Sequence, residues 1–216
     1  MTARIAIVTT VDLAVPDADE ELLLPHLPEA ELVAWDNPEV DWASYEVAIL
    51  RSTWNYTERL PEFLEWASRI SGVTRLVNPL ETVVWNTDKR YLDDLAARGL
   101  PVVPTTFIEP GETADAALLA GSVVVKPSVG AGSAGAALFH DDEAAAAAHL
   151  ASLHADGRVA MVQPYLSQVD EVGETALIYL GGKFSHAARK AAILSRGMSW
   201  STGLYADEKI APCDAT

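Results

Sequence analysis

Apolar runs alternate with amphipathic segments along the first third of the chain. Strand-like runs cover Arg4–Thr10, Glu31–Trp35, Glu46–Leu50 and Thr74–Val77, and helix-like segments cover Glu20–Leu27 and Pro61–Ile70. Strands that alternate with helices are typical of a parallel sheet. We therefore predict a small parallel α/β domain over residues 1–86.

Residues 87–190 have a different pattern, in which hairpins are more frequent. The predicted elements are a helix over Thr87–Arg98, an alanine-rich helix over Asp142–Leu153, a strand over Ala160–Gln163 and a hairpin of Thr175–Leu180 with Lys183–Ala188. Thr87 can cap the first helix and Gly99 can end it. Residues 191–216 have a weak, polar pattern, and we interpret them as the start of an incomplete C-terminal subdomain.

The segment Val123–Phe139 carries the strongest chemical signal. An apolar run ends in Lys126, a loop with glycines at 130, 132 and 135 follows, and a second apolar run comes after it. Glycine has no Cβ, so backbone N–H groups can approach an anion, and the lysine adds a positive charge beside them. We interpret this strand–loop–strand segment as a hairpin that folds over the phosphates of a nucleotide.

The same glycines also match the dinucleotide fingerprint G-x-G-x-x-G. That fingerprint requires a strand directly before the glycines and a helix directly after them, whereas a short apolar run follows here. The hairpin is therefore favoured, but a nicotinamide-linked dehydrogenase and a surface hairpin without a ligand remain alternatives.

Composition narrows the classes of function. The net charge of −16 disfavours nucleic acid and anionic membranes as partners. We found no apolar run of membrane-spanning length and no signal-peptide pattern, and a single cysteine gives no disulfide framework, so we expect a cytoplasmic protein. The histidines lack metal-ligand spacing, and no metal ligand is predicted within the chain.

An ordered set of motifs resembles the ATP-grasp superfamily, closest to its glutathione-synthetase-like and RimK-like ligases and especially to the cycloserine-biosynthesis type. The motifs are Leu50–Tyr56, Asn78-Pro79, Trp85–Leu92, Val125–Pro127, Gln163–Glu174 and His186–Lys190. The resemblance implies an α/β ATP-grasp fold, in which residues 1–86 form the N-terminal domain and residues 87–190 the nucleotide-binding region with antiparallel hairpins.

The resemblance also implies roles for individual residues, with ATP bound between two subdomains. Lys89 and Lys126 would bind the α- and β-phosphates, and the loop with Ser128, Gly130, Gly132, Ser133 and Gly135 would cover the β- and γ-phosphates. Gln163, Pro164, Tyr165 and Leu166 would form a hinge against the adenine, and Glu174, with Glu171 as substitute, would hold the ribose.

Two further groups of residues are implied to act on the substrates. Arg189 and Lys190 would be catalytic, reaching the transferring phosphate or the substrate carboxylate. Arg51, Ser52 and Trp54 would face the acceptor substrate, which agrees with the position of Arg51 directly after a strand. Relatives usually have aspartate where this chain has Asn55, so the role of Asn55 is open.

The implied activity is an ATP-dependent carboxylate–amine ligase that forms an acyl phosphate on an amino-acid or small peptide-like substrate. Magnesium is the implied metal. Its ligands in the family lie in a C-terminal strand pair with aspartate and glutamate, so we expect them beyond residue 216 and expect weak or no ligase activity from these residues alone. The alternative function is a non-catalytic ATP-binding module. A homodimer is compatible with both the ligase and the module.

Overall fold

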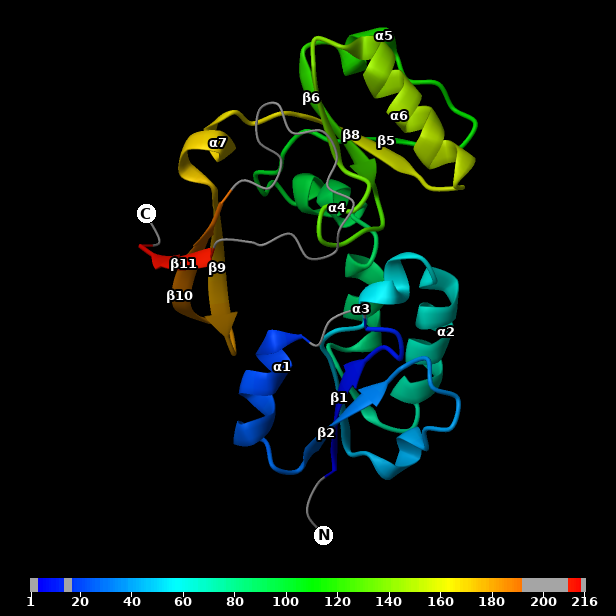
Figure 1. Ribbon diagram of the computed structural model, residues 1–216, viewed down its shortest axis with the longest axis vertical. Helices are drawn as coiled ribbons and strands as arrows, with labels where there is room; N and C mark the ends of the chain where they lie inside the picture. The colour runs from blue at the N-terminus through cyan, green and yellow to red at the C-terminus, as the bar shows by residue number, and fades with distance from the viewer. Residues whose placement is uncertain (1–3, 14–16, 192–209, 215–216) are drawn as a thin grey trace. The chain divides into compact units, whose positions relative to one another are not determined.

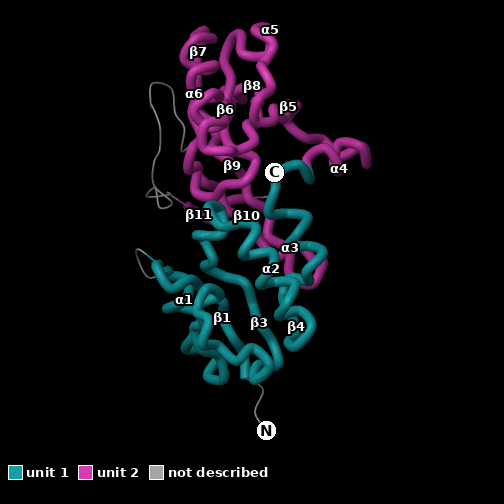
Figure 2. Tube along the Cα trace, turned by 90° about the vertical axis from the view of Figure 1, so that its right-hand side faces the viewer, with its two compact units in different colours: residues 1–91 teal, residues 92–216 magenta. Residues whose placement is uncertain are grey.

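The computed structural model describes residues 4–13, 17–191 and 210–214 and divides the chain into two compact units, residues 1–91 and 92–216 (Figure 2). The predicted fold class is confirmed, because a parallel sheet is followed by antiparallel sheets (Figure 1). The sequence pattern predicts a domain boundary after residue 86, whereas the chain divides into its compact units after Tyr91.

The first unit is a four-stranded parallel sheet in the order β2-β1-β3-β4. Its strands are β1 (Ile5–Thr9), β2 (Ala30–Ala34), β3 (Val47–Leu50) and β4 (Arg75–Val77), and its helices are α1 (Ala18–Leu23), α2 (Leu60–Ser71) and α3 (Leu80–Asn86). Short 3-10 helices are η1 (Leu24–His26), η2 (Trp42–Ser44) and η3 (Trp54–Thr57). Figure 1 shows α1 on the opposite side of the sheet from α2 and α3.

Aromatic side chains form the core of the first unit. The ring of Phe63 on α2 lies 5.2 Å from that of Trp35 and 5.4 Å from that of Trp66, and Trp66 lies 5.2 Å from Trp42. All four residues are buried. Because large aromatic rings dominate the area removed from water, this cluster fixes α2 against the sheet.

The prediction of one helix over Thr87–Arg98 is wrong. The structure has α3 up to Asn86 and a separate helix, α4 (Tyr91–Ala97), after a turn. The Thr87 hydroxyl donates to the Val84 carbonyl at 3.3 Å, so Thr87 closes α3 and does not cap a new helix. Asp88 then accepts the backbone N–H of Arg90 at 3.0 Å, which forms the turn that contains Lys89.

The second unit contains a four-stranded antiparallel sheet in the order β5-β8-β6-β7. Its strands are β5 (Thr106–Ile108), β6 (Ser122–Pro127), β7 (Ala137–His140) and β8 (Ala160–Pro164), with the helices α5 (Ala116–Leu119) and α6 (Glu143–Ala155). Asp142 caps α6 by accepting the N–H of Ala145 at 3.0 Å. Val123, Val125 and Val162 share a buried cluster with Leu150 of α6, so α6 covers one face of the sheet (Figure 1).

A second sheet of this unit has the order β11-β10-β9 and is antiparallel. After α7 (Gln168–Val172) come β9 (Glu174–Leu180) and β10 (Lys183–Lys190), joined at Gly181-Gly182 as predicted. The weak, polar pattern of residues 191–216 predicts no strand there, which is wrong for β11 (Ile210–Cys213), whose residues pair with Ala187–Lys190. The polar stretch 195–203 lies outside the described residues. No helix in the described ranges is long and apolar enough to cross a membrane.

Removal of the Phe63 ring tests the packing of the first unit. We expect Phe63→Ala to lower the free energy of unfolding by about 3–5 kcal/mol, because loss of the ring leaves a cavity beside Trp35, Tyr56 and Trp66. Urea unfolding followed by tryptophan fluorescence measures this, since five of the six tryptophans lie in residues 1–91. Leu22→Ala, at a side chain 72% exposed, is the control and should change stability by less than about 0.5 kcal/mol. Equal effects of the two substitutions would contradict this description of the core.

Candidate nucleotide and substrate sites

Strand β6 places Lys126 on the face of its sheet that α6 does not cover. Side chains alternate between the faces of a strand, so Val123 and Val125 point to α6 while Val124 and Lys126 point to the other face. Residues directly opposite each other on paired strands share a face of the sheet. Val124 lies opposite Gln163 and Lys126 lies opposite Met161, so all four residues are on one face. The predicted phosphate-binding lysine and the first residue of the predicted hinge therefore lie on the same face.

Lys126 is half-buried, and its charge is only partly compensated. Burial lowers the pKa of Lys126 from its usual range, and the negative charge of Glu174 on β9 acts in the opposite direction. No carboxylate of the described ranges lies within ion-pair distance of the ammonium group. A partly desolvated lysine of this kind gains from binding an anion.

The glycine loop is the connection of the β6–β7 hairpin, and no helix follows it. This geometry confirms the predicted hairpin and excludes the Rossmann turn. Gly132 and Ser133 both have positive φ, 57° and 61°, in a turn closed by the Ala134 N–H and the Ala131 carbonyl at 3.0 Å. Such a turn favours glycine.

The backbone amide of Ser128 is already used within the protein. It donates to the Val159 carbonyl at 3.0 Å and thereby extends the pairing of β6 with β8, and the Ser128 side chain is buried. Any contact of this loop with phosphates would therefore involve residues after Ser128.

The predicted hinge lies where the chain leaves the first sheet of the second unit and continues to the second. Gln163 donates to the Thr105 hydroxyl at 2.8 Å, and the N–H of Tyr165 donates to the Ser122 carbonyl at 2.9 Å, just after Pro164 ends β8. The Tyr165 hydroxyl donates to Asp170 on α7, while Leu166 is exposed.

The two predicted ribose ligands also differ in their surroundings. Glu171 is exposed on α7, whereas Glu174 starts β9 and is the carboxylate that interacts with Lys126. Of the two, Glu174 is the one that the structure brings near the predicted phosphate lysine.

The two predicted catalytic residues lie on opposite faces of the β9–β10 sheet. Lys190 pairs with Glu174 and Arg189 pairs with Thr175, and consecutive residues of a strand alternate between faces. Arg189 donates to the Thr175 hydroxyl at 3.4 Å. The structure therefore brings Lys190, and not Arg189, to the face of Glu174.

In the first unit, two of the predicted substrate residues are held by acidic residues of α1. Arg51 forms an ion pair with Asp19 and lies 3.8 Å from Asp17. The fully buried Ser52 donates to Glu20 and lies 2.8 Å from the Thr9 hydroxyl. Both residues follow β3 at the carboxyl edge of the sheet, where open α/β sheets bind ligands.

Glu20 is a buried carboxyl group at this edge, with 3% of its surface exposed. Burial raises the pKa of Glu20, although the hydrogen bond from Ser52 favours the ionised form. Glu20 was not predicted as a site residue, because its segment has the sequence pattern of an ordinary acidic surface helix.

A second carboxylate, Asp36, organises the segment that contains Trp54. It follows β2 and accepts hydrogen bonds from the Thr10 hydroxyl at 3.0 Å, the Val11 N–H at 2.9 Å and the Asn55 amide at 2.8 Å. Arg59 forms an ion pair with it at 2.9 Å. Burial would raise the pKa of Asp36, but the hydrogen bonds from Val11, Asn55 and Thr10 outweigh burial and lower it.

This arrangement gives Asn55 a role that an aspartate could not fill. Its amide donates to Asp36, and its carbonyl oxygen accepts the indole N–H of Trp35 at 2.7 Å. An ionised aspartate accepts but does not donate, and it would place a second negative charge beside Asp36.

The remaining predicted residues of this unit are Trp54 and Lys89. Trp54 begins η3, and its buried indole N–H has no acceptor among the described residues. Lys89 is half-buried in the turn between α3 and α4. Lys89 belongs to the first unit and Lys126 to the second.

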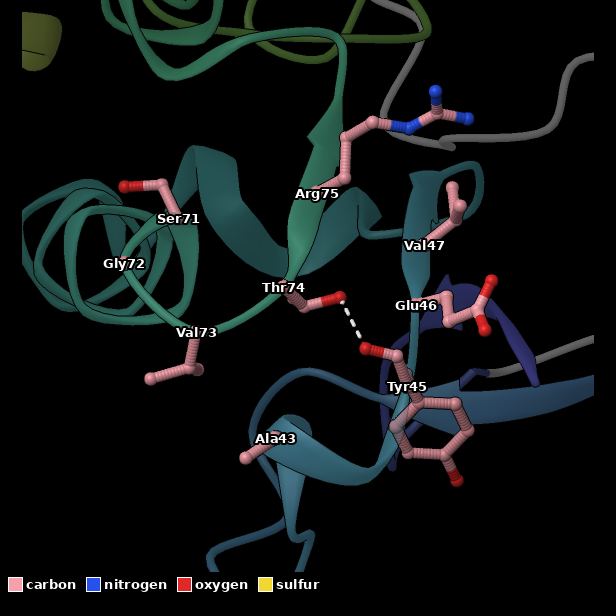
Figure 3. Close-up of a pocket in the computed structure, with 9 residues that line it drawn as sticks. All are labelled: Ala43, Tyr45, Glu46, Val47, Ser71, Gly72, Val73, Thr74 and Arg75. Carbon is pink, nitrogen blue, oxygen red and sulfur yellow. Dashed lines mark hydrogen bonds between the residues drawn. The ribbon is translucent and has the colours of Figure 1, made fainter. Parts of the chain in front are cut away.

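Two open grooves lie away from all predicted site residues. One of about 800 Å³ lies at the amino ends of β3 and β4, where the Thr74 hydroxyl donates to the Tyr45 carbonyl at 2.8 Å (Figure 3). The other, of about 550 Å³, lies beside β5 and α5. The first is at the sheet edge opposite to Arg51 and Ser52, so we do not assign a ligand to it.

The hydrogen bonds around Asp36 predict that an aspartate at position 55 lowers the stability of the protein. At pH 7 we expect Asn55→Asp to lower the free energy of unfolding by about 1–3 kcal/mol, because a donor is lost beside a buried carboxylate. Urea unfolding of both proteins between pH 3 and pH 7 measures this difference in the free energy of unfolding. Asp36 has a lowered pKa, so its stabilisation is present above its usual pKa and is lost as the pH falls through the lowered value. The penalty should therefore shrink in acid.

Asn37→Asp is the matched control. Asn37 accepts the N–H of Glu39 through its side-chain oxygen, a role that aspartate retains, so its stability should stay within about 0.5 kcal/mol of the unsubstituted protein. A penalty for Asn55→Asp that is no larger than this, or that does not change with pH, would disprove the role assigned to Asn55.

Comparisons with known proteins identify the family. Residues 5–78 match the N-terminal domain of D-cycloserine synthetase DcsG. The cycloserine biosynthesis protein DcsG of Streptomyces lavendulae is 42% identical over 174 residues, which cover 76% of this chain and 58% of that protein. This chain thus spans less than two thirds of the length of that relative.

Solved structures agree with this match. The crystal structure of D-cycloserine synthetase DcsG superposes with a TM-score of 0.88 at 36% identity, covering 99% of this chain and 76% of that one. The RimK domain ATP-grasp protein of Sphaerobacter thermophilus (TM-score 0.63, 21% identity, 87% of this chain and 72% of that one) shares the fold. The D-alanine–D-alanine ligase of Bacillus anthracis also shares the fold, with a TM-score of 0.61 at 16% identity, covering 100% of this chain and 72% of that one. The chain belongs to the ATP-grasp ligase family and is close, within it, to D-cycloserine synthetase DcsG.

Proposed function

We propose that this chain is the nucleotide-binding and substrate-binding part of an ATP-dependent ligase that joins a carboxylate to an amine. The observation that carries the proposal is Lys126, a partly desolvated cation at the end of β6, directly before the glycine loop and near Glu174. These groups are suited to a nucleotide, because the lysine can neutralise phosphate charge and the loop can present N–H donors.

Each group has a proposed task in binding ATP. Lys126 holds a phosphate, the loop after Ser128 covers the phosphates, and Glu174 holds the ribose. The hinge at Gln163–Leu166 carries the adenine between the two sheets of the second unit. Lys190 is favoured over Arg189 as the residue that reaches the transferring phosphate, since its strand position is opposite Glu174.

Lys89 is proposed as the second phosphate lysine. Bound ATP would supply the phosphoryl group that converts the substrate carboxylate into an acyl phosphate, a better electrophile for the amine. The chain itself contributes charge neutralisation and orientation.

The acceptor is proposed to be an amino acid or a close analogue. Relatives include a D-cycloserine synthetase and a D-alanine–D-alanine ligase, and the carboxyl edge of the first sheet presents Arg51 and Ser52. The ion pair with Asp19 supports the view that Arg51 can hold a carboxylate. A substrate carboxylate would replace Asp19 there, near Trp54.

Magnesium is the metal proposed to accompany ATP. Residues 4–13, 17–191 and 210–214 contain no group of three or more His, Cys, Asp or Glu side chains that could hold an ion, so we assign no metal ligand within these ranges and no step to a metal. A cytoplasmic location and a homodimeric assembly are further proposals.

Replacement of Lys126 tests the proposed nucleotide site. We expect Lys126→Met to weaken ATP binding by about 10- to 100-fold, because a charge-assisted hydrogen bond to phosphate is lost. Isothermal titration with ATP measures this. Lys183→Met removes an exposed lysine at the start of β10 and should leave the affinity unchanged. Similar affinities for both variants would refute the site.

The lowered pKa of Lys126 predicts a pH dependence of binding. Only the charged lysine neutralises phosphate, and a bound anion raises the pKa of its partner. ATP affinity should therefore be constant below the lowered pKa of the free protein and fall as the pH rises through it towards 10.5. In Lys126→Arg this fall should disappear, because arginine stays charged. Titrations at several pH values decide between these outcomes.

The reaction itself is tested by release of ADP with candidate amino acids and magnesium. Turnover supports the ligase and would contradict the weak or absent activity expected of these residues alone. A rise in melting temperature with ATP but no ADP release is expected both of these residues alone and of the non-catalytic ATP-binding module. A rise with NAD in place of ATP would contradict the nucleotide assignment.

A further inference from the structure

The two ends of the glycine loop are held by two side chains that no motif contains. We propose that Arg158 and His149 are positioning residues, which brace the loop at residues 128–135 in the shape that receives a nucleotide. The bracing of the loop by these two residues does not depend on the proposed function. Its consequence for nucleotide binding does rest on the proposed function.

Arg158 holds the first end of the loop. Its Nη2 donates to the Val129 carbonyl at 2.9 Å, and the next residue, Val159, accepts the N–H of Ser128 at 3.0 Å. The chain segment after α6 therefore makes two adjacent hydrogen bonds to the start of the loop. Only one of the five N–H donors of the guanidinium is needed for this contact.

The guanidinium also lies against both outer glycines. A Cβ at Gly130 would lie 3.8 Å from Nη2 of Arg158 and 3.3 Å from Cγ of Pro127. A Cβ at Gly135 would lie 3.4 Å from Nη1 of Arg158 and 3.2 Å from Cδ of Pro127. Arg158 and Pro127 thus occupy the base of the loop, and the glycines allow the backbone to approach them closely.

His149 holds the second end of the loop. Its Nε2 lies 2.9 Å from the Gly135 carbonyl oxygen, so this nitrogen carries the proton and donates. The ring is 7% exposed and lies 5.8 Å from the ring of Phe139 on β7. A buried donor on a rigid helix fixes the point at which the loop returns to the sheet.

Between these anchors, the turn at Gly132 and Ser133 is closed by local hydrogen bonds of Ala134 and Ala136. A loop with fixed ends loses less freedom when it closes over a ligand, which increases affinity without a new contact. Arg158 also has no carboxylate within ion-pair distance among the described residues, so its positive charge adds to that of Lys126 in an acidic protein.

The test measures the loop in the full chain with His149→Phe and Arg158→Met. Hydrogen exchange of the amides at 129–136, without nucleotide, should accelerate by about two- to tenfold in each variant, the effect of one lost hydrogen bond. The affinity for ATP should fall by a similar factor. His149→Gln retains a donor near the position of Nε2 and should restore both values, and Arg158→Lys retains the charge and should bind ATP better than Arg158→Met.

His154→Phe is the matched control. His154 lies on the same helix, but its Nε2 is 3.1 Å from the Ile108 carbonyl on β5, away from the loop. It should leave loop exchange and affinity unchanged. Unchanged loop exchange in folded His149→Phe and Arg158→Met, or equal acceleration in His154→Phe, would overturn the proposal. Failure of the unsubstituted protein to bind ATP would count against the proposed function alone, since exchange in the free protein still tests the brace.

Discussion

The pairing of β6 with β7 on one side and β8 on the other is the interaction on which the candidate nucleotide site depends. Its register directs Val123 and Val125 to α6 and leaves Lys126 on the opposite face with Gln163. The pairing continues beyond the strand through Ser128 and Val159, so the glycine loop begins at a fixed point. A shift of one residue would bury the lysine against α6 and expose two valines.

Most of the fold could be predicted, because its signals are local. The alternation of strands and helices predicted the parallel sheet, and the runs around Lys126 and around Gly181-Gly182 predicted the two hairpins. The break between α3 and α4 could not be predicted, since it depends on the hydroxyl of Thr87 and the carboxylate of Asp88 bonding to backbone groups. Strand β11 was missed because its short segment becomes a strand through its partner β10.

The candidate site was predictable only where one segment carries the signal. Lys126 and the glycine loop are contiguous, whereas Arg158, His149, Glu20 and Asp36 reach their partners through the tertiary fold. In the first unit, carboxylates already hold Arg51, Ser52 and Asn55: the exposed one of Asp19 pairs with Arg51, and the buried ones of Glu20 and Asp36 accept from Ser52 and Asn55. The polar edge of that sheet is therefore internally paired, and a ligand carboxylate would have to compete with those of α1.

A crystal structure of the protein with a non-hydrolysable ATP analogue tests the central claim most directly. The account predicts that the phosphates lie beneath residues 129–135 with the ammonium group of Lys126 in contact with a phosphate oxygen, and that the ribose lies beside Glu174. A nucleotide bound elsewhere, with Lys126 and the glycine loop free of contacts to it, would contradict the account.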